Sequence, residues 1–474
     1  MSAIVRLGIA AGVALNALPA FALNPDDAVP ELKGADLSLL WGAPFAGLLL
    51  SIALAPLFAP AFWHRHYGKV TAAWALAFLA PFALRFGAVE TAHHLAHALL
   101  LEYLSFVVIL FSLFTIAGGI CVRGALVGTP ALNTGLLALG AVLASVMGTT
   151  GASMLLIRPL LTANETRRHK VHVVIFFILL VGNVGGALSP LGDPPLFIGF
   201  LKGVDFFWTT RELARPTALV VAGLLAIFWV VDRWFHRAEP ARAPAATAGE
   251  PIVLEGKLNF VLIAGVIGAV LLSGLWDSHV AFDVLSARVE LEKLVRDALL
   301  VVLALLSLAV TPRAVREHNQ FHWAPIIEVA KLFAGIFVTI IPVIAILSAA
   351  RAGALAGVID LVVDPSGQPR NAMLFWTAGL LSAFLDNAPT YLVFFNMAGG
   401  DATRLMGPLG ATLAALSMGA VYFGALTYIG NAPNFMIKAI AEDRGVAMPG
   451  FLAYTAYASV ALLPLMAVIS VLFL

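Results

Sequence analysis

Two aspartates in apolar surroundings are the residues of this chain best suited to carry chemistry. Asp193 lies in the stretch GALSPLGDPPLFI, residues 186 to 198, and Asp386 lies in SAFLDNAPT, residues 382 to 390. An apolar medium penalises a charged carboxylate unless a cation lies beside it, so one position can hold either a proton or a sodium ion. That competition is a sufficient mechanism for exchanging the two ions.

The stretch around Asp193 occurs a second time, 238 residues later, as GALTYIGNAPNFM over residues 424 to 436. Six of the thirteen positions are identical, and Asn431 stands where the first copy has Asp193. Glycine and proline interrupt a long apolar segment in both copies, which breaks a membrane helix. Broken helices at corresponding positions of two halves indicate the binding site of a transporter.

Each broken helix offers carbonyl oxygens on one side of its gap and N–H groups on the other. Sodium, as a hard cation, prefers oxygen ligands. We therefore predict one cation site in each half, with Asp386 and Asp193 as proton carriers. The predicted ligands of the first half are Thr149, Thr150, Ser189 and Asp193, and those of the second half are Asp386, Asn387, Thr390, Thr427 and Asn431.

Two structural alternatives to this site stay open. Asp193 and Asn431 can cap the half-helices that follow them, because a side-chain oxygen at such a position accepts the first free N–H groups. Asp386 can be a permanently charged partner of a basic residue, and the candidates are Arg158, Lys331 and Lys438.

The composition places these residues in a polytopic membrane protein. The chain has 474 residues, 61% of them hydrophobic and 12% charged, and apolar runs of about 20 residues recur along it, the length that spans a bilayer. A net charge of +1 gives no reason to expect a nucleic-acid partner, and a single cysteine, Cys121, excludes a disulfide framework. The expected surroundings are a lipid bilayer.

The apolar runs predict an all-α fold of about ten or eleven transmembrane helices. Two further paired segments, 132–163 and 372–400, carry helix-breaking or polar residues at their centres and are predicted as re-entrant hairpins. The predicted spans are 38–62, 70–88, 101–121, 172–204 with its break, 216–234, 258–275, 297–311, 326–350, 409–441 with its break, and 451–473.

The order of these segments predicts two halves of inverted orientation. The first half covers 38–235 and the second 258–474, and an odd number of crossings separates the two hairpins. Inverted repeats permit two equivalent conformations that open to opposite sides of the membrane. The segment 236–257 is expected to be a cytoplasmic linker, because the basic residues of the short loops gather on its side.

The N-terminal residues 1–22 are predicted to be a signal peptide that is cleaved after Ala22, since Arg6 precedes a short apolar run that ends in Ala20-Phe21-Ala22. A first transmembrane helix that stays attached is the alternative. The roles of Glu102 and Glu328, and of His93, His94 and His97, are left open. No carboxylate or cysteine completes a recognisable transition-metal site around these histidines.

The hairpins and breaks resemble those of the ion transporter superfamily, which includes citrate transporters, the D-type bacterial sodium/proton antiporters and arsenite permeases. The resemblance rests on Ser382-Ala383-Phe384-Leu385-Asp386-Asn387-Ala388-Pro389-Thr390 and on Gly192-Asp193-Pro194-Pro195, and it covers roughly residues 40–474. It implies alternating access, sodium and protons as coupling ions without other cofactors, a bacterial inner membrane, and a homodimer.

Three functions are weighed against these residues. Sodium:proton antiport is favoured, because the polar residues of the core are acidic rather than basic. The alternative is sodium- or proton-coupled transport of citrate or a related carboxylate, although the hairpin tips lack the Ser-Asn-Thr that is usual in carboxylate symporters of the superfamily. The remote alternative, an intramembrane enzyme, is disfavoured because no Gly-x-Ser-x-Gly or His-Glu-x-x-His stretch is present.

Overall fold

The protein is an all-α polytopic membrane protein, as the sequence predicts. The computed structural model describes residues 32–124, 126–239, 251–284, 287–365 and 367–474. The predicted signal peptide or first helix over 1–22, and residues 240–250 of the predicted linker, lie outside the described residues.

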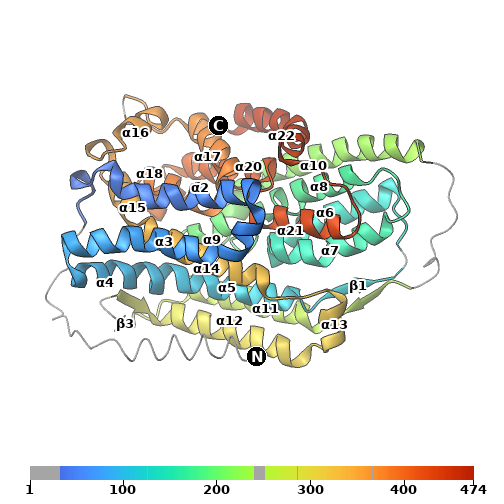
Figure 1. The fold of residues 1–474 in the computed structure, drawn as a ribbon, viewed down its shortest axis with the longest axis horizontal. Helices are drawn as coiled ribbons and strands as arrows, with labels where there is room; N and C mark the ends of the chain where they lie inside the picture. Colours follow the sequence, from blue (N-terminus) through green and yellow to red (C-terminus); the bar gives the residue numbers. More distant parts are fainter. Residues whose placement is uncertain (1–31, 125, 240–250, 285–286, 366) are drawn as a thin grey trace. The chain divides into compact units, whose positions relative to one another are not determined.

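The helices follow one order twice (Figure 1). Each series contains two helices, a bent or irregular helix, a helix pair, a broken helix and a last long helix. The first series is α2 (Ala43–Phe58), α3 (Pro60–Phe86), α4 (Ala88–His97) with α5 (Leu104–Ala117), α6 (Pro130–Met147) with α7 (Thr149–Ala163), α8 (Val171–Leu180) with α9 (Pro194–Leu201), and α10 (Trp208–Arg237).

The second series repeats this order with similar lengths. It is α11 (Leu258–Leu275), α12 (Leu291–Val310), α14 (Ala324–Thr339) with α15 (Ile341–Ser348), α17 (Asn371–Phe384) with α18 (Asn387–Met397), α20 (Gly410–Phe423) with α21 (Ala432–Asp443), and α22 (Phe451–Phe473). Short helices occupy the connections: α13 (Arg313–His318), α16 (Ala356–Val362) and α19 (Ala402–Met406).

Two small antiparallel sheets were not predicted. Strand β1 (Cys121–Arg123) pairs with β2 (Val253–Glu255), and β3 (Ala281–Val284) pairs with β4 (Ala287–Glu290). Strands of three or four residues leave no alternating pattern long enough to read. A hydrogen bond from His318 on α13, together with Arg123, holds the pKa of Glu255 below its ordinary value and fastens α13 to the first sheet.

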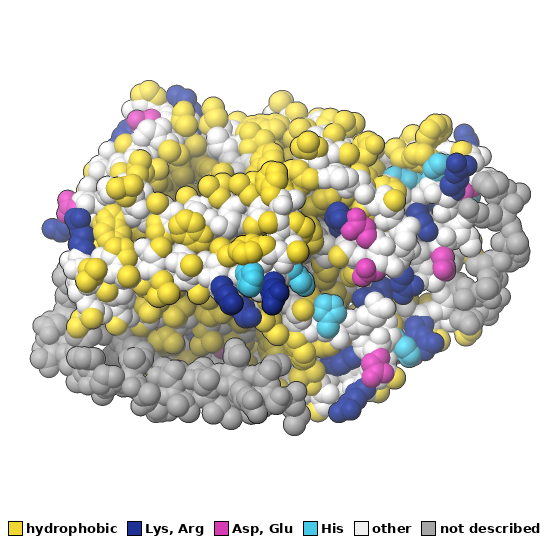
Figure 2. Space-filling view, in the orientation of Figure 1, with side chains coloured by type: hydrophobic (Ala, Val, Ile, Leu, Met, Phe, Trp, Pro, Cys, Tyr) yellow, Lys and Arg dark blue, Asp and Glu magenta, His cyan; other side chains and the backbone are white. Residues whose placement is uncertain are grey.

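By length and composition, eight of the described helices can cross a membrane, or nine if the bent pair α14 and α15 counts as one span. Two predicted crossings fall outside this set. Helix α12 carries four charged residues near its start, and the broken helix α20 and α21 consists of shorter pieces. In Figure 2 hydrophobic side chains cover most of the face shown, and charged side chains gather mainly toward its right side, as expected of a surface that lies in lipid.

The predicted spans lie close to the observed helices, with two differences. Helix α3 begins at Pro60, ten residues before the predicted span, and includes Arg65 and Lys69. The predicted span 101–121 belongs to a longer helical segment, Ala88–Ala117, which contains a π-helical turn over Ala98–Tyr103. Both extensions carry histidines or basic residues, which lower the local hydropathy. A prediction from apolar runs therefore places the helix start too late.

The two halves are equivalent down to single hydrogen bonds at the breaks. The Ser189 hydroxyl donates to the Ser145 carbonyl, and the Thr427 hydroxyl, 238 positions later, donates to the Ala383 carbonyl. Thr149 N–H donates to Gly192 O at 2.9 Å, and the equivalent Asn387 N–H donates to Gly430 O at 3.2 Å. These bonds attach the tip of each helix pair to the break of the helix that follows it.

The backbone segments on the two sides of each break approach each other so closely that only glycine fits at positions 192 and 430. A Cβ on Gly192 would lie 2.0 Å from the Gly186 carbonyl oxygen, and a Cβ on Gly430 would lie 2.7 Å from the Gly424 carbonyl oxygen. Both contacts are with backbone atoms, which cannot rotate away. The glycines of the repeat are therefore required by the geometry of the break.

Gly192→Ala is expected to abolish the folded protein, because the added methyl group must push the two sides of the break apart. The measurement is the yield of monodisperse protein in detergent, together with its thermal unfolding. Gly268→Ala is the matched control, since a Cβ on Gly268 in α11 meets nothing within 4 Å. Equal yields and melting temperatures for the two variants would contradict the account of the break.

Candidate functional site

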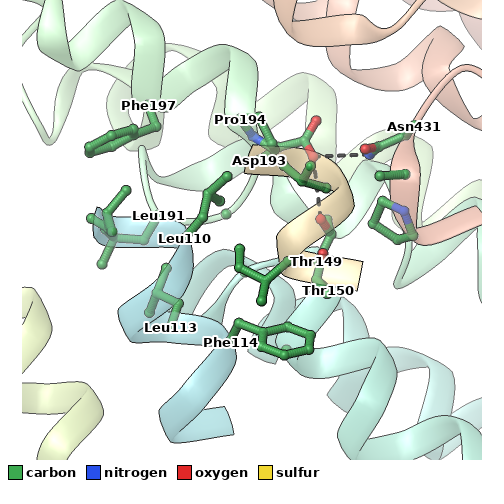
Figure 3. A pocket seen from close by; sticks show the side chains of 18 of the residues that line it. Leu110, Leu113, Phe114, Thr149, Thr150, Leu191, Asp193, Pro194, Phe197 and Asn431 are labelled. Carbon is green, nitrogen blue, oxygen red and sulfur yellow. Dashed lines mark hydrogen bonds between the residues drawn. The ribbon is translucent and has the colours of Figure 1, made fainter. Parts of the chain in front are cut away.

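A cavity of about 90 Å³ lies where the helix tips and breaks meet. Its polar residues come from the tips of the helix pairs α6 and α7 and α17 and α18 and from the breaks, and its apolar wall comes mainly from α5 and α14. Figure 3 shows Leu110, Leu113 and Phe114 on α5 across from Asp193 and Asn431. The cavity has room for a few water-sized groups.

Asp193 is the centre of the polar side of this cavity (Figure 3). It is 1% exposed, and its carboxylate accepts three hydrogen bonds. The donors are Thr149 Oγ1 at 3.3 Å and Asn431 Nδ2 at 3.0 Å on one oxygen, and Asn387 Nδ2 at 2.6 Å on the other. The carboxylate thus contacts residues from the tips of both helix pairs and from the second break.

This arrangement brings residues predicted for the two cation sites together. Asn387 and Asn431 belong to the second half, yet their amides donate to Asp193 of the first half. The reason is that the second part of each broken helix packs against the helix pair of the other half: α9 against α18, and α21 against α7. Asp386 lines the same cavity, so both carboxylates share one site.

The capping alternative is wrong for both of its positions, whereas Asp386, for which no cap was predicted, does cap a helix. Asp193 and Asn431 precede α9 and α21, but neither side chain makes a capping hydrogen bond. Asp386, in contrast, caps α18 by accepting from Ala388 N–H at 3.1 Å. A capping carboxylate keeps free lone pairs and can still face the cavity.

Three predicted ligands direct their hydroxyls elsewhere. Ser189 and Thr427 donate to backbone carbonyls and accept backbone N–H groups inside the breaks. Thr390 donates to the Asp386 carbonyl at 3.0 Å, within its own helix. None of the three lines the cavity, so we leave them out of the proposed ion site. Thr149 and Thr150 do line it.

Two asparagines that the sequence analysis did not single out complete the network. Asn183, at the first break, donates to Asn434 Oδ1 at 2.7 Å and accepts from Asn431 Nδ2 at 3.2 Å. Asn434 in turn donates to the carbonyls of Gly424 and Thr427. Both asparagines are fully buried. The signal that could have found them is a lone amide within an apolar run, since such a group must find partners inside the protein.

No basic side chain occurs among the described residues that line the cavity. Arg158 donates to Asn319 and Gln320, Lys438 pairs with Glu442, and the Lys331 ammonium lies 5.3 Å from the centre of the Tyr67 ring. The proposed pairing of Asp386 with one of these three cations is therefore wrong. The site has two carboxylates and no fixed counter-charge from a side chain.

None of the glutamate and histidine residues left open by the sequence lines the cavity. Glu102 pairs with Lys202, and His94 pairs with Glu90 at 3.1 Å. Among the described residues, no group of three or more His, Cys, Asp or Glu side chains is arranged to hold a metal ion.

A second buried polar cluster joins the opposite ends of α6 and α7 to α8 and α10. Asp232 is fully buried, forms an ion pair with Arg167 at 2.6 Å, and accepts hydrogen bonds from His172 at 2.7 Å and Asn133 at 3.0 Å. Asn164, at the end of α7, exchanges two hydrogen bonds with Asn133. The cluster fixes the base of the helix pair whose tip carries Thr149.

Asp232→Ala is expected to destabilise the protein by about 3 kcal/mol or more, because it leaves the buried Arg167 guanidinium without its carboxylate. Unfolding of the purified protein in detergent measures the change. Asp360→Ala is the matched control, since Asp360 makes an exposed ion pair with Arg351. A loss no larger than that of the control would show that the cluster does not anchor the helix pair.

The fold and the site together define a membrane transporter with an internal repeat: broken helices meet helix tips around a buried polar cavity, inside a bundle of apolar helices. The comparison with known families agrees. The chain belongs to the family described as "Putative citrate transport", whose model matches residues 34–474. This confirms the resemblance to the ion transporter superfamily.

Two curated relatives are also described as transporters. A protein of Mycobacterium bovis, named an uncharacterized transporter, is 26% identical to this chain over 338 residues, which cover 67% of this chain and 71% of the relative. A protein of Mycobacterium tuberculosis with the same description has the same identity and coverage.

Proposed function

We propose that the protein is a sodium:proton antiporter of the bacterial plasma membrane that works by alternating access. The observation that carries this proposal is that Asp193 and Asp386 line one cavity whose described lining residues include no Lys, Arg or His. Two carboxylates without a basic partner require cations or protons for neutrality, because an unpaired buried charge is costly.

The residues at the cavity have two proposed roles, proton binding and sodium coordination. Asp193 and Asp386 each bind either a proton or part of the coordination shell of sodium. Thr150 lines the cavity and supplies a neutral oxygen. Asn387 does not line the cavity, but its amide contacts Asp193, and its Oδ1 is buried without a hydrogen-bond partner in the described part of the chain, so it can supply a second neutral oxygen. A half-turn of the Asn387 amide would direct that oxygen toward the Asp193 side of the cavity.

Competition within one cavity is enough to couple the two ions. Sodium binding requires a deprotonated carboxylate, so protons leave when sodium enters. We take it that the protein changes the side to which the site opens only when the site holds sodium or protons. Each such change then carries one kind of ion across the membrane. Sodium affinity then falls as pH falls, because protons occupy the same carboxylates.

A second candidate is cation-coupled transport of citrate. The family description favours it, and so does one structural feature: α7, α9, α18 and α21 all begin at the site, at Thr149, Pro194, Asn387 and Ala432. Helix N-termini attract anions. Arg158 and Lys438, whose positive charges could help to neutralise citrate, do not line the cavity.

A flux assay in proteoliposomes separates the two candidates. Purified protein is reconstituted with a pH-sensitive dye inside, a pH gradient is imposed, and sodium, lithium, potassium or citrate is added at several pH values. If the protein is an antiporter, sodium collapses the pH gradient in the absence of citrate, and potassium leaves the gradient intact. No response to sodium, together with sodium- or proton-driven uptake of labelled citrate, would favour the second candidate and reject the first.

A further inference from the structure

A second cavity lies at the far end of α9 from the carboxylate site. It measures about 370 Å³ and lies between residues 200–207 after α9, the end of α11 and the start of α12. Lys202, Lys293 and Arg296 line it, and each is paired with an acid: Glu102, Glu290 and Asp297. A large cavity with balanced charges suits water and hydrated ions rather than one tightly held ligand.

The two cavities approach each other from opposite ends of the helix bundle. The second one lies where α11 ends and α12 begins. The first one is lined by Phe114 near the end of α5 and by Pro325 and Ile326 at the start of α14. Strand β1 follows α5, and α13 precedes α14, and Figure 1 shows β1 and α13 at one end of the bundle. The lining residues therefore place the first cavity toward the β1 and α13 end. Helix α11 begins just after β2, and α12 ends just before α13. The second cavity lies at the opposite ends of these two helices, away from β1 and α13.

Aromatic rings lie between the two cavities along α9. Phe197 lines the first cavity and Phe200, one turn later, lines the second, and their ring centres are 6.1 Å apart. Phe106 on α5 lies against Phe197 at 6.3 Å and stacks on Phe333 of α14 at 4.5 Å. Phe106, Phe197 and Phe333 are all buried.

We propose that the second cavity is an access vestibule for the face opposite β1 and α13, and that Phe106, Phe197 and Phe333 form the seal between this vestibule and the carboxylate site. An ion cannot cross packed aromatic rings, because it would lose its water without gaining oxygen ligands. Access from the vestibule therefore requires Phe197 on α9 to separate from Phe106 and Phe333 on α5 and α14.

The inference concerns the path to the site and holds for either ion or citrate, so its test uses no substrate. Cys121 is the only cysteine of the chain, and Cys121→Ser provides a background without thiols. Thr150→Cys places a thiol in the first cavity, and Ser273→Cys places one in the second. The probe is a charged, membrane-impermeant methanethiosulfonate added to right-side-out or inverted vesicles.

The Ser273→Cys thiol is expected to react from the face opposite β1 and α13, and the Thr150→Cys thiol from the β1 and α13 face. Adding Phe197→Ala should accelerate the reaction of Thr150→Cys from the vestibule face at least tenfold. Phe207→Ala is the control, because Phe207 lines the vestibule but contacts none of the three sealing rings in the described structure.

Phe333→Leu serves as a second opening variant if Phe197→Ala does not fold, which the melting temperature shows. Unchanged labelling in a folded opening variant would overturn the seal, and so would equal reactivity of Thr150→Cys from both faces in the background protein. Loss of sodium-dependent flux has no bearing on these labelling rates, so failure of the seal and failure of sodium:proton antiport are distinguishable.

Discussion

Asp193→Asn lowers the affinity for sodium by roughly ten- to a hundredfold, because the variant removes the charge at the centre of the site. Contacts of a charged group are worth about 1.5–3 kcal/mol each, and 1.4 kcal/mol corresponds to a factor of ten. The fold should persist. An asparagine oxygen can still accept from Thr149 and Asn431, and a half-turn of the Asn387 amide lets its unpartnered Oδ1 accept from the new amide.

The measurement is the sodium dependence of the melting temperature in detergent, followed by the sodium dependence of flux in proteoliposomes. A ligand that binds only the folded protein stabilises it by RT ln(1 + [L]/Kd), so weaker binding moves the stabilisation to higher sodium concentration. Asp360→Asn is the control, since Asp360 makes an exposed ion pair with Arg351 and does not line the cavity. Unchanged sodium dependence in Asp193→Asn would reduce this residue to a structural part of the network.

Asp386→Asn abolishes proton-coupled exchange while the protein still inserts and folds. Asparagine caps a helix about as well as aspartate, so the hydrogen bond from Ala388 N–H can persist in the variant. What is lost is a carboxylate that can release or take up a proton in the cavity. Residual sodium binding through Asp193 is expected to remain, but its dependence on pH should become weaker.

Flux in proteoliposomes over a pH series tests this second expectation, with Asp401→Asn as the control. Asp401 also caps a helix, α19, by accepting from Thr403 and Arg404 N–H groups, but it does not line the cavity. Exchange that stays pH-dependent in Asp386→Asn would rule out this residue as the proton carrier. Equal losses in both variants would attribute the effect to capping.

The sequence predicted the fold because glycine, proline and hydropathy act locally. The offset of 238 residues paired Gly192 with Gly430 and Asp193 with Asn431, and the structure shows equivalent hydrogen bonds at these positions. It also shows a direct hydrogen bond between Asp193 and Asn431 at 3.0 Å. Residues from both copies of the repeat therefore line one cavity.

The features that the sequence did not predict depend on contacts between distant segments. Nothing in the spacing shows that the two breaks lie together, so the partners of Asn431, which are Gly182, Asn183 and Asp193 at the first break, could not be derived. Asn183 and Asn434 are 251 positions apart and meet only because both breaks lie together. For the same reason Ser189 and Thr427 were predicted as ion ligands: their residue type fits, and only the folded break shows that backbone groups already use their hydroxyls.

The central claim, that sodium and protons compete for two carboxylates in one cavity, is tested most directly by titrating sodium into the purified protein in an isothermal calorimeter. Repeating the titration in buffers of different ionisation enthalpy gives the number of protons released on binding. Sodium binding is expected to release protons, up to about one per carboxylate below the pH range where the carboxylates titrate and fewer as pH rises. Sodium binding with no proton release at any pH, or citrate binding without sodium binding, would contradict it.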